Sequence, residues 1–480
     1  MTDLAPHRRW LVLAICCLSL LMVSLDTTAL NVALPSIQHD LGSSVSGLQW
    51  TIDAYTLVLA SLLMFAGSLA DRIGRRRVFR TGLTVFITGS VLCSIAPGLG
   101  WLIAARVVQA IGGSMLNPVA MSIVSNVFPD SRERARAIGI WSGVVGISMA
   151  AGPLLGGALV ETAGWRAIFW LNAPIGLTAL LLTRWYVPES RAERPRRVDP
   201  IGQALVIVLL ATTTYAIIES PVRGWSSPLV IACAATAAGA LLTFLRYARR
   251  RTDPLIDLRF FHSVPFCGAT LIAVAAFFSL GGFLFVSSLY LQNVRHLDAL
   301  HAGLFMLPMA AMAMVSAPLS GRIVAARGPR VPLVTAGVAL AASATLQALT
   351  YSVHLSTAVL VPAYALFGIG FGLVNAPITN TAVSAMPRSQ AGVAAAVAST
   401  SRQLGQALGV AVIGALMATT SHTNPTDFVH TGRTAWWLIA GCGALILLIG
   451  TLTTGRWAQS TAQHTAKRLA VEETRATVRA

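Results

Sequence analysis

The sequence predicts an all-α integral membrane protein with fourteen transmembrane helices, and three observations lead to this expectation. Hydrophobic residues make up 55% of the 480-residue chain and charged residues only 11%, whereas a soluble protein carries roughly 25% charged residues. Apolar runs of about 18 residues or more, long enough to cross a bilayer as a helix, recur along the whole length. The segments between them are alternately rich and poor in arginine, as expected for loops on opposite sides of a membrane.

The expected spans leave no room for a long soluble domain. In chain order they are 10–34, 48–70, 78–96, 101–127, 137–160, 168–187, 201–218, 228–245, 264–290, 302–324, 331–350, 356–383, 392–420 and 434–454. Tryptophan favours the two interfaces of a bilayer and marks several of the predicted ends. Examples are Trp10, Trp50, Trp101, Trp185 and Trp436.

The net charge of +17 is explained better by membrane topology than by nucleic-acid binding, because the arginines lie in short loops between apolar segments. If the N-terminus is cytoplasmic, the cytoplasmic segments hold 29 of the 35 basic residues, the outer loops hold four and the helices hold two. A missed or invented helix would invert this pattern downstream of the error. We therefore expect both termini in the cytoplasm. The 34 arginines against one lysine favour a GC-rich bacterial genome, and hence a bacterial inner membrane.

No pattern for bound metal, cofactor or catalysis is present. The six cysteines lie in or at the edge of apolar segments without metal-site spacing. The sequence shows no nucleotide-binding loop and no catalytic constellation, so we expect neither an enzyme nor an ATP-driven pump. Arg8 and Arg9 precede an apolar run, as in a signal peptide. Removing that run would leave thirteen spans and destroy the charge pattern, so we expect it to be the first span.

An internal repeat divides the chain. Residues 105–139 align without a gap on residues 363–397, which places Asn117 on Asn375. The offset of 258 residues corresponds to eight predicted helices, so two helices lie between two similar sets of six. Parallel six-helix repeats are a known construction of secondary transporters. We expect an N-terminal bundle over 1–190, a two-helix insert with its flanking loops over 191–262, a C-terminal bundle over 263–455 and a cytoplasmic tail over 456–480.

Asp26 is the first charged residue that needs a functional explanation. An ionised carboxylate at the bilayer centre costs about 2.5–3.5 kcal/mol even on insertion scales, and intramembrane charges usually mark substrate or proton pathways. At 1.5 Å per residue, Asp26 lies about 24 Å from the inner surface, while Asp53 and Arg106 lie about 5 and 8 Å from the outer surface. All three charges are therefore expected in the outer half of the membrane.

A carboxylate near Arg106 would suit proton coupling. Burial disfavours the charged form of a carboxyl group, whereas a neighbouring arginine favours it. An aspartate that moves toward or away from Arg106 can therefore bind a proton in one state and release it in the other. We expect Asp26, Asp53 and Arg106 to form the site of proton or cationic-substrate coupling.

The loop after the second predicted span reads GSLADRIGRRR over residues 67–77. Glycine at 67 permits close packing and glycine at 74 permits a tight turn. Asp71 and Arg75 can join an ion-pair cluster when the inner ends of the two halves meet. We expect a cytoplasmic gate formed by Gly67, Asp71, Arg72, Gly74 and Arg75. The second-half counterpart, GRIVAARGPR over 321–330, has no aspartate, so the gate is expected to be asymmetric.

The fifth span carries a helix face almost without side chains. Residues 139, 143, 146, 150, 153 and 157 lie on one face and are Gly, Gly, Gly, Ala, Pro and Gly. Small residues allow another helix to approach closely, and a proline inside a helix introduces a kink. We expect a helix contact or hinge whose motif residues are Gly143, Gly146, Gly152, Pro153, Gly156 and Gly157.

These motifs together resemble the major facilitator superfamily, and within it the fourteen-helix drug:proton antiporter subfamily of the quaternary-ammonium and multidrug-resistance type. The loop at 67–77 resembles the superfamily loop signature, and Arg106, Gln109 and Gly112 resemble its Arg-x-x-Gln-x-x-Gly pattern. The Gly152–Gly157 segment resembles the antiporter signature. LDTTALNVALP (25–35), WTIDAYTLVLA (50–60), GWRAIFWLNAPIG (164–176) and STSRQLGQALGVAV (399–412) resemble further subfamily patterns.

The resemblance implies proton-coupled efflux of lipophilic, often cationic, drugs or antibiotics. We expect the protein to be a monomer. Two alternatives stay open: a proton-coupled importer of a polar metabolite, and an exporter dedicated to one endogenous antibiotic. A receptor or scaffold that does not transport would not need the gate loop. The second half offers few polar side chains, so we expect a mostly apolar cavity. Its candidate polar residues are Asn31, Gln109, Asn117, Asn375, Asn380, Arg402 and Gln403.

Overall fold

The computed structural model describes residues 5–192, 199–251, 254–384, 386, 390–418, 425–455 and 457–466. In this part of the chain fourteen α-helices of 20 residues or more follow one another. They are α1 (Pro6–Leu41), α2 (Val45–Ile73), α3 (Arg75–Ser94), α4 (Leu99–Val127), α5 (Ser131–Ala163), α6 (Arg166–Tyr186), α7 (Pro200–Arg223), α8 (Pro228–Arg250), α9 (Val264–Leu289), α10 (Ala299–Arg327), α11 (Arg330–Thr350), α12 (Thr357–Ser384), α13 (Ala391–Ala418) and α14 (Pro425–Leu452).

The sequence fixes several helix starts through side chains that accept hydrogen bonds from backbone amides left free in the first turn. The Asp130 carboxylate accepts from the amides of residues 132 and 133 at the start of α5. Asp298 does the same for the amide of His301 at the start of α10. At the end of α1, Gly42 adopts a left-handed conformation with φ 58°, and its amide bonds to the Gln38 carbonyl. Such caps allow short loops to join long apolar helices.

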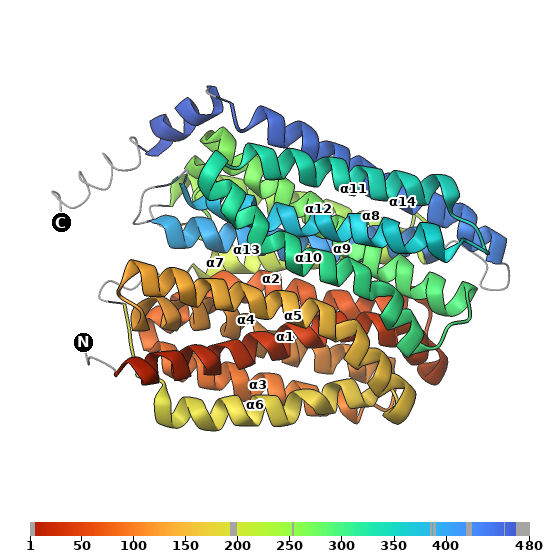
Figure 1. The fold of residues 1–480 in the computed structure, drawn as a ribbon, viewed down its shortest axis with the longest axis horizontal. Helices are drawn as coiled ribbons and strands as arrows, with labels where there is room; N and C mark the ends of the chain where they lie inside the picture. Colours follow the sequence, from red (N-terminus) through yellow and green to blue (C-terminus); the bar gives the residue numbers. More distant parts are fainter. Residues whose placement is uncertain are drawn as a thin grey trace.

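The helices form two groups with the same internal packing. In the first, α3 packs on α4 and α6, α1 on α5 and α6, and α2 on α4. In the second, α11 packs on α12 and α14, α9 on α13 and α14, and α10 on α12. Each contact therefore recurs eight helices later in the chain. Figure 1 shows the two groups, with α1–α6 in red to yellow below and α9–α14 in green to blue above.

The repeated glycines explain why the two groups pack alike. A side chain at Gly112 on α4 would meet the backbone of Gly82 and Phe86 on α3. A side chain at Gly370 on α12 would meet Ala336 and Leu340 on α11 in the same way. Residues 112 and 370 are equivalent in the sequence repeat, so both repeats use glycine for close contact between adjacent helices.

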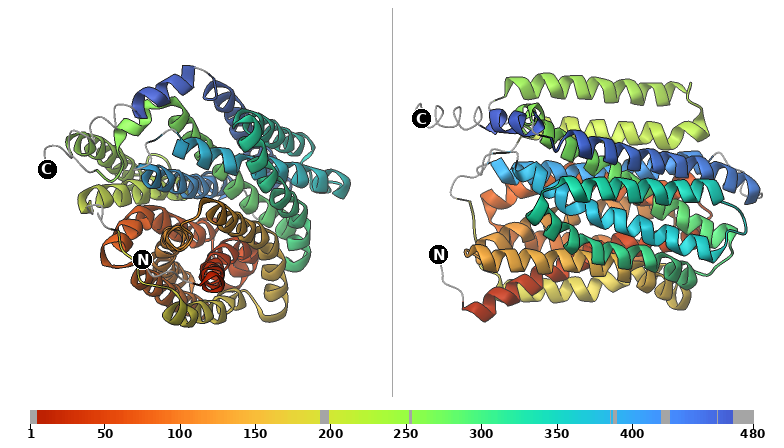
Figure 2. Two further views of the ribbon diagram at one scale, coloured as in Figure 1. Left: turned by 60° about the vertical axis from the view of Figure 1, so that its left-hand side comes forward. Right: turned by 45° about the horizontal axis from the view of Figure 1, so that its top comes forward.

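The helices α7 and α8 lie outside both groups. The contacts of α7 are with α2 of the first group and α13 of the second, whereas α8 packs mainly on α7. The right-hand view of Figure 2 shows α8 outermost, with α7 between it and the rest of the molecule. The Gln203 amide donates a hydrogen bond to the Ser61 carbonyl of α2, and the Trp50 indole donates to Glu219 at 3.1 Å. These contacts hold α7 over the line where α2 meets α13.

Twelve of the fourteen helices are long and apolar enough to cross a membrane, and α3 and α13 are not among them. Apolarity alone therefore supports twelve spans in the described residues rather than the fourteen expected from the sequence. The physical reason differs between the two helices. Four arginines fall within the first six residues of α3, and Arg402, Gln403 and Gln406 lie within α13. These polar side chains lower the mean hydropathy of helices that otherwise pack among the spans.

The contacts between the two groups gather toward one end of the molecule. Ser288 on α9 donates to the Asn31 carbonyl on α1 at 2.5 Å, and Gln49 on α2 donates to the Ala411 carbonyl on α13 at 2.7 Å. The first turns of α1 and the helical residues 457–466 lie at the opposite end (Figure 1). The two ends of the described chain therefore lie on one side of the molecule, as an even number of membrane crossings requires.

Candidate functional site

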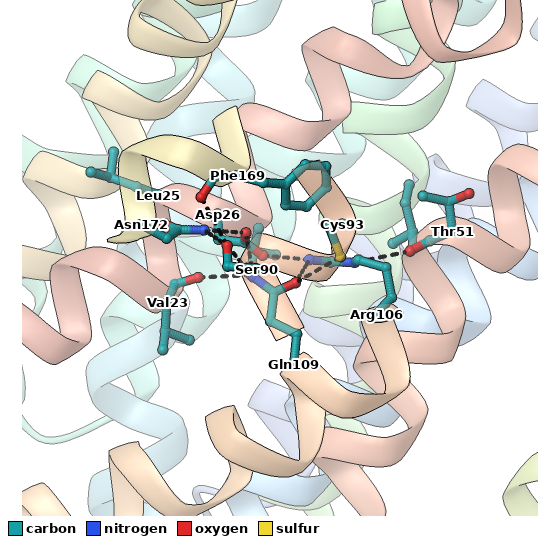
Figure 3. Close-up of polar contacts among 12 residues, drawn as sticks. Val23, Leu25, Asp26, Thr51, Ser90, Cys93, Arg106, Gln109, Phe169 and Asn172 are labelled. Atoms are coloured by element: carbon teal, nitrogen blue, oxygen red, sulfur yellow. Dashed lines mark hydrogen bonds and ion pairs between the residues drawn. The ribbon is translucent and has the colours of Figure 1, made fainter. Parts of the chain in front are cut away.

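A buried ion pair between Asp26 on α1 and Arg106 on α4 forms the centre of the candidate site. The Arg106 Nη1 donates to the Asp26 Oδ2 at 2.5 Å, and both side chains are at most 1% exposed. The same Nη1 donates to the Gln109 Oε1 at 2.7 Å, and the Arg106 Nε donates to the Thr51 carbonyl at 3.2 Å. The expected meeting of Asp26 with Arg106 is therefore observed (Figure 3).

Two amides complete the coordination of the Asp26 carboxylate. Gln109 Nε2 donates to Oδ1 at 2.8 Å, and Asn172 Nδ2 on α6 donates to the same oxygen at 2.7 Å. Asn172 also donates to the Ser90 hydroxyl on α3 at 2.9 Å, and Figure 3 shows these side chains converging from separate helices. Together with Arg106, these two amides join α1 to α4 and α6 through one buried carboxylate.

Aromatic rings enclose the arginine. The Arg106 guanidinium lies 4.1 Å from the centre of the Tyr55 ring on α2 and 5.9 Å from that of Phe169 on α6. A cation over an aromatic face gains about 0.5–2 kcal/mol, depending on how far it is desolvated. The rings also exclude water from the ion pair. Arg106 is thus held by α1, α2, α4 and α6 at once, and movement of any of these helices changes its contacts.

Asp53 lies on α2 outside this network. Its side chain is fully buried, and among the described residues only the Thr56 hydroxyl, at 3.4 Å, donates to its Oδ1. Its Oδ2 is buried without a hydrogen-bond partner among the described residues. The expectation of a single site with all three charges is thus met only for Asp26 and Arg106. The cause is the helix face, since the α2 side chain that contacts Arg106 is Tyr55, and Asp53, two residues before it, does not face the same way.

The expected cavity residues divide between the two groups. On α1, Asn31 is buried and donates to the Thr27 carbonyl at 2.9 Å, while its own carbonyl meets Ser288 of the second group. On α4, Asn117 is half-buried, and its Oδ1 is buried without a partner in the described part of the chain. Gln109 belongs to the Asp26 site. The three residues therefore have different surroundings, although the sequence predicted all of them as residues of one cavity.

In the second group, Arg402 is the most notable polar residue. It is half-buried on α13, donates to the Thr379 hydroxyl on α12, and lies 5.9 Å from the Phe277 ring on α9. Its Nε is buried without a partner among the residues described. Asn375 donates to the Phe371 carbonyl of its own helix at 3.1 Å. Of the remaining candidates, Asn380 is exposed and Gln403 is half-buried.

The loop between α2 and α3 contains the expected pair. Arg75 donates to the Asp71 carboxylate at 2.9 Å, one helical turn away. Gly74 between them has φ 118°, a conformation that side chains rarely adopt. Arg72 is exposed. The expectation that Gly67 permits close packing is wrong in this arrangement, because a side chain there would meet no atom within 4 Å. Ala66 and Ala70 on either side of it along α2 are buried, so the open space is confined to the side of the helix that Gly67 faces.

A second acid, Glu189, reaches the same loop from the segment after α6. It accepts a hydrogen bond from the amide of Arg76 at 3.0 Å and lies 3.8 Å from the guanidinium of Arg77. A side chain at Gly74 would come within 2.6 Å of the Glu189 carboxylate. The backbone joins the two segments further, since the Arg75 amide donates to the Ser190 carbonyl at 2.9 Å. Sequence reasoning missed Glu189 because it lies more than a hundred residues from the loop.

The glycine-rich face of α5 packs closely along only part of its length. A side chain at Gly157 would meet α10 at Ala299, and one at Gly146 would lie 3.1 Å from Met314 of α10. Side chains at Gly152 and Gly156 would meet Thr28 and Ala29 of α1.

The Pro153 carbonyl of α5 touches the Gly303 position of α10. A side chain at Gly143, one turn before Gly146, would meet nothing within 4 Å. The glycine-rich face of α5 therefore packs closely from Gly146 to Gly157, whereas it is open at Gly143.

Asn172, Ser90 and Tyr55 were not predicted as site residues. All three are buried among apolar residues, where single Asn, Ser and Tyr residues are common and carry no charge to mark them. Only for Asn172 did the sequence offer a hint, because NAPIG (172–176) belongs to a segment that resembles a subfamily pattern. Among the described residues, no group of three or more His, Cys, Asp or Glu could hold a metal ion.

Comparison with known proteins places this architecture among transporters. A family model described as Major Facilitator Superfamily matches residues 16–410. The chain is 39% identical over 401 residues to "Multidrug resistance protein Stp" of Mycobacterium tuberculosis, covering 84% of this chain and 74% of that protein. It is 36% identical to "Tetracenomycin C resistance and export protein" of Streptomyces glaucescens, covering 86% and 76%, and 36% identical to "Methylenomycin A resistance protein" of Streptomyces coelicolor, covering 87% and 90%.

A solved structure has the same overall fold. It is the crystal structure of a bacterial homologue of the human lysosomal transporter Spinster, in an inward-facing and unoccupied conformation. The TM-score is 0.66, the sequence identity is 19%, and the match covers 96% of this chain and 99% of the other. At this identity the likeness concerns the fold alone.

Proposed function

Because the chain belongs to the Major Facilitator Superfamily, we propose that it exports lipophilic or cationic drugs or antibiotics across the bacterial inner membrane in exchange for protons. Three relatives that cover most of the chain are named for multidrug resistance, for antibiotic resistance or for antibiotic export. The chain is therefore a transporter rather than an enzyme. Its partners are a small-molecule substrate, protons and the lipid bilayer.

The observation that carries the proton coupling is the buried Asp26–Arg106 pair. In the present arrangement the carboxylate accepts hydrogen bonds from Arg106, Gln109 and Asn172. A helix movement that withdraws Arg106 would leave a buried carboxylate without its counter-charge, and protonation would then be favoured. One proton that crosses about 100 mV supplies about 2.3 kcal/mol. Alternation between the two arrangements would couple that energy to export.

We propose that α3 and α13 also cross the membrane, which gives fourteen spans and two cytoplasmic termini. Both helices pack on helices that are apolar enough to span, α3 on α4 and α6, and α13 on α9 and α2. The recurrence of each contact eight helices later supports an N-terminal bundle over 1–190, an insert over 191–262, a C-terminal bundle over 263–455 and a tail over 456–480. We also propose that the protein works as a monomer.

The described arrangement fits a state open toward the cytoplasm. The contacts of Asn31 and Gln49 with the second group lie away from the termini. At the other end, side chains added at Gly67 and at its repeat partner Gly321 would meet nothing within 4 Å. We propose that this end closes around Asp71 and Arg75 in the opposite state. The close contact of α5 with α10 then serves as the pivot.

A second candidate is an exporter dedicated to one antibiotic. Two of the relatives are each named for a single antibiotic, tetracenomycin C and methylenomycin A. Two measurements separate the candidates: growth of a sensitive host that expresses the gene, on a panel of antibiotics and cationic dyes, and dye efflux from inverted vesicles. Protection against several unrelated compounds supports multidrug export, and protection against one supports the dedicated exporter. A substrate that accumulates in intact cells instead would indicate an importer and contradict both.

A further inference from the structure

A basic groove lies between the cytoplasmic parts of α3 and α6, far along the helices from the Asp26 site. It encloses about 370 Å³ and is lined by Arg77, Arg80, Thr81, Thr84, Val85 and Leu180. The five residues from α3 span little more than two turns at the start of that helix. None of them belongs to the expected gate residues or to the Asp26 network, although Arg77 lies near Glu189 as described above.

The polar end of the groove has unused hydrogen-bonding capacity. The Nε of Arg80 is buried without a hydrogen-bond partner among the described residues. Arg77 is largely exposed and lies 3.8 Å from Glu189, whose carboxylate also meets Arg76. The acid is therefore shared between two arginines, and the groove keeps a net positive charge. A buried donor without a partner costs free energy, which a bound acceptor would recover.

The groove changes from polar to apolar along the helix axis. Val85 lies eight residues after Arg77, or about 12 Å at 1.5 Å per residue. Leu180 faces it from α6, and Leu181 beside it is exposed. Arg184, one turn closer to the cytoplasmic end of α6 than Leu180, is also exposed. The groove therefore offers cationic groups at the level of lipid headgroups and aliphatic groups at the level of acyl chains.

We propose that this groove binds an anionic phospholipid of the cytoplasmic leaflet, with the headgroup phosphate on Arg77 and Arg80 and an acyl chain along Val85 and Leu180. Basic pockets between transmembrane helices on the cytoplasmic side suit such headgroups. The threonine hydroxyls at 81 and 84 can donate to the headgroup when they turn from the carbonyls of their own helix, with which they now bond. The bound lipid fixes the start of α3, which carries the gate arginine Arg75.

Native mass spectrometry of the purified full-length protein tests the proposal by titration with phosphatidylglycerol and, separately, with phosphatidylcholine. Each surface arginine contributes about 1 kcal/mol to binding an anionic membrane lipid, or about fivefold in affinity. We expect Arg80→Gln to weaken phosphatidylglycerol binding about fivefold and the Arg77→Gln/Arg80→Gln double variant up to about thirtyfold. Arg327→Gln removes an exposed arginine at the end of α10 and should leave binding unchanged. Phosphatidylcholine should bind more weakly than phosphatidylglycerol.

Three outcomes would overturn the proposal. The first is equal phosphatidylglycerol binding by the wild type and the double variant. The second is equal weakening by Arg327→Gln. The third is displacement of the lipid by glycerol 3-phosphate at matched concentration, which would identify a site for free phosphates. If the double variant is unfolded, as judged by its melting temperature, Thr81→Glu replaces it. That exposed position adds a negative charge and keeps both arginines, and it should also weaken lipid binding.

Discussion

Asp26 and Arg106 lie eighty residues apart in the chain, yet their side chains meet at 2.5 Å in the buried interior of the first helix group. A buried charge that loses its partner destabilises a protein by about 3–5 kcal/mol, while replacement of both partners costs less. Burial of this pair therefore costs free energy, and packing alone does not explain why it is present. Its value follows if the two side chains separate and rejoin during transport.

Asn172 should tune this site. Asn172→Ala removes one of two amide donors to the Asp26 Oδ1, and a hydrogen bond to a charged group contributes about 1.5–3 kcal/mol. The Asp26–Arg106 arrangement is then held less firmly, so efflux should fall about tenfold or more, since about 1.4 kcal/mol corresponds to a factor of ten. The measurement is dye efflux from vesicles at equal amounts of inserted protein. Thr178→Ala, at an exposed position on the same helix, is the control, and equal efflux by the two variants would remove Asn172 from the site.

The contact between α5 and α10 should tolerate no large side chain. At Gly146 even a methyl group would lie 3.1 Å from Met314, so Gly146→Leu should abolish transport by forcing the two helices apart. Ile147 is 53% exposed, and Ile147→Leu should leave transport unchanged. Efflux is compared at equal amounts of inserted protein. Equal effects of the two substitutions would show that this contact is not needed for the transport cycle.

Asp71 should affect transport more than insertion. Its carboxylate pairs with Arg75 at a partly exposed position, where an ion pair contributes only about 0–1 kcal/mol to stability. Asp71→Asn should therefore insert normally and still export poorly, because the closed state needs the charge. Membrane content by immunoblot and dye efflux are measured together. Normal efflux at normal content would leave Asp71 as an ordinary loop residue.

The sequence predicts the helices and the central ion pair because both follow from local rules. Apolar length gives the helices, and depth along them brings Asp26 near Arg106. Asn172 and Ser90 could not be found in this way, since an uncharged polar residue in an apolar helix has many possible partners. The expectation for Gly67 was wrong because the neighbours of a residue depend on helices distant in the chain, about which its local sequence says nothing. Because α3 and α13 carry polar residues, their hydropathy does not reveal that they pack among the apolar helices.

Substrate-induced proton release from vesicles, compared between the wild type and Asp26→Asn at matched expression, tests the central claim most directly. The variant leaves the buried Arg106 without its counter-charge, which is destabilising, so the two proteins are compared at equal amounts of folded, inserted protein. It should release no protons when substrate is added and should lose export, with cationic substrates affected most. Leu349→Asn, at an exposed position on α11, is the control and should behave as the wild type. Undiminished proton release from Asp26→Asn would contradict the account and direct attention to Asp53.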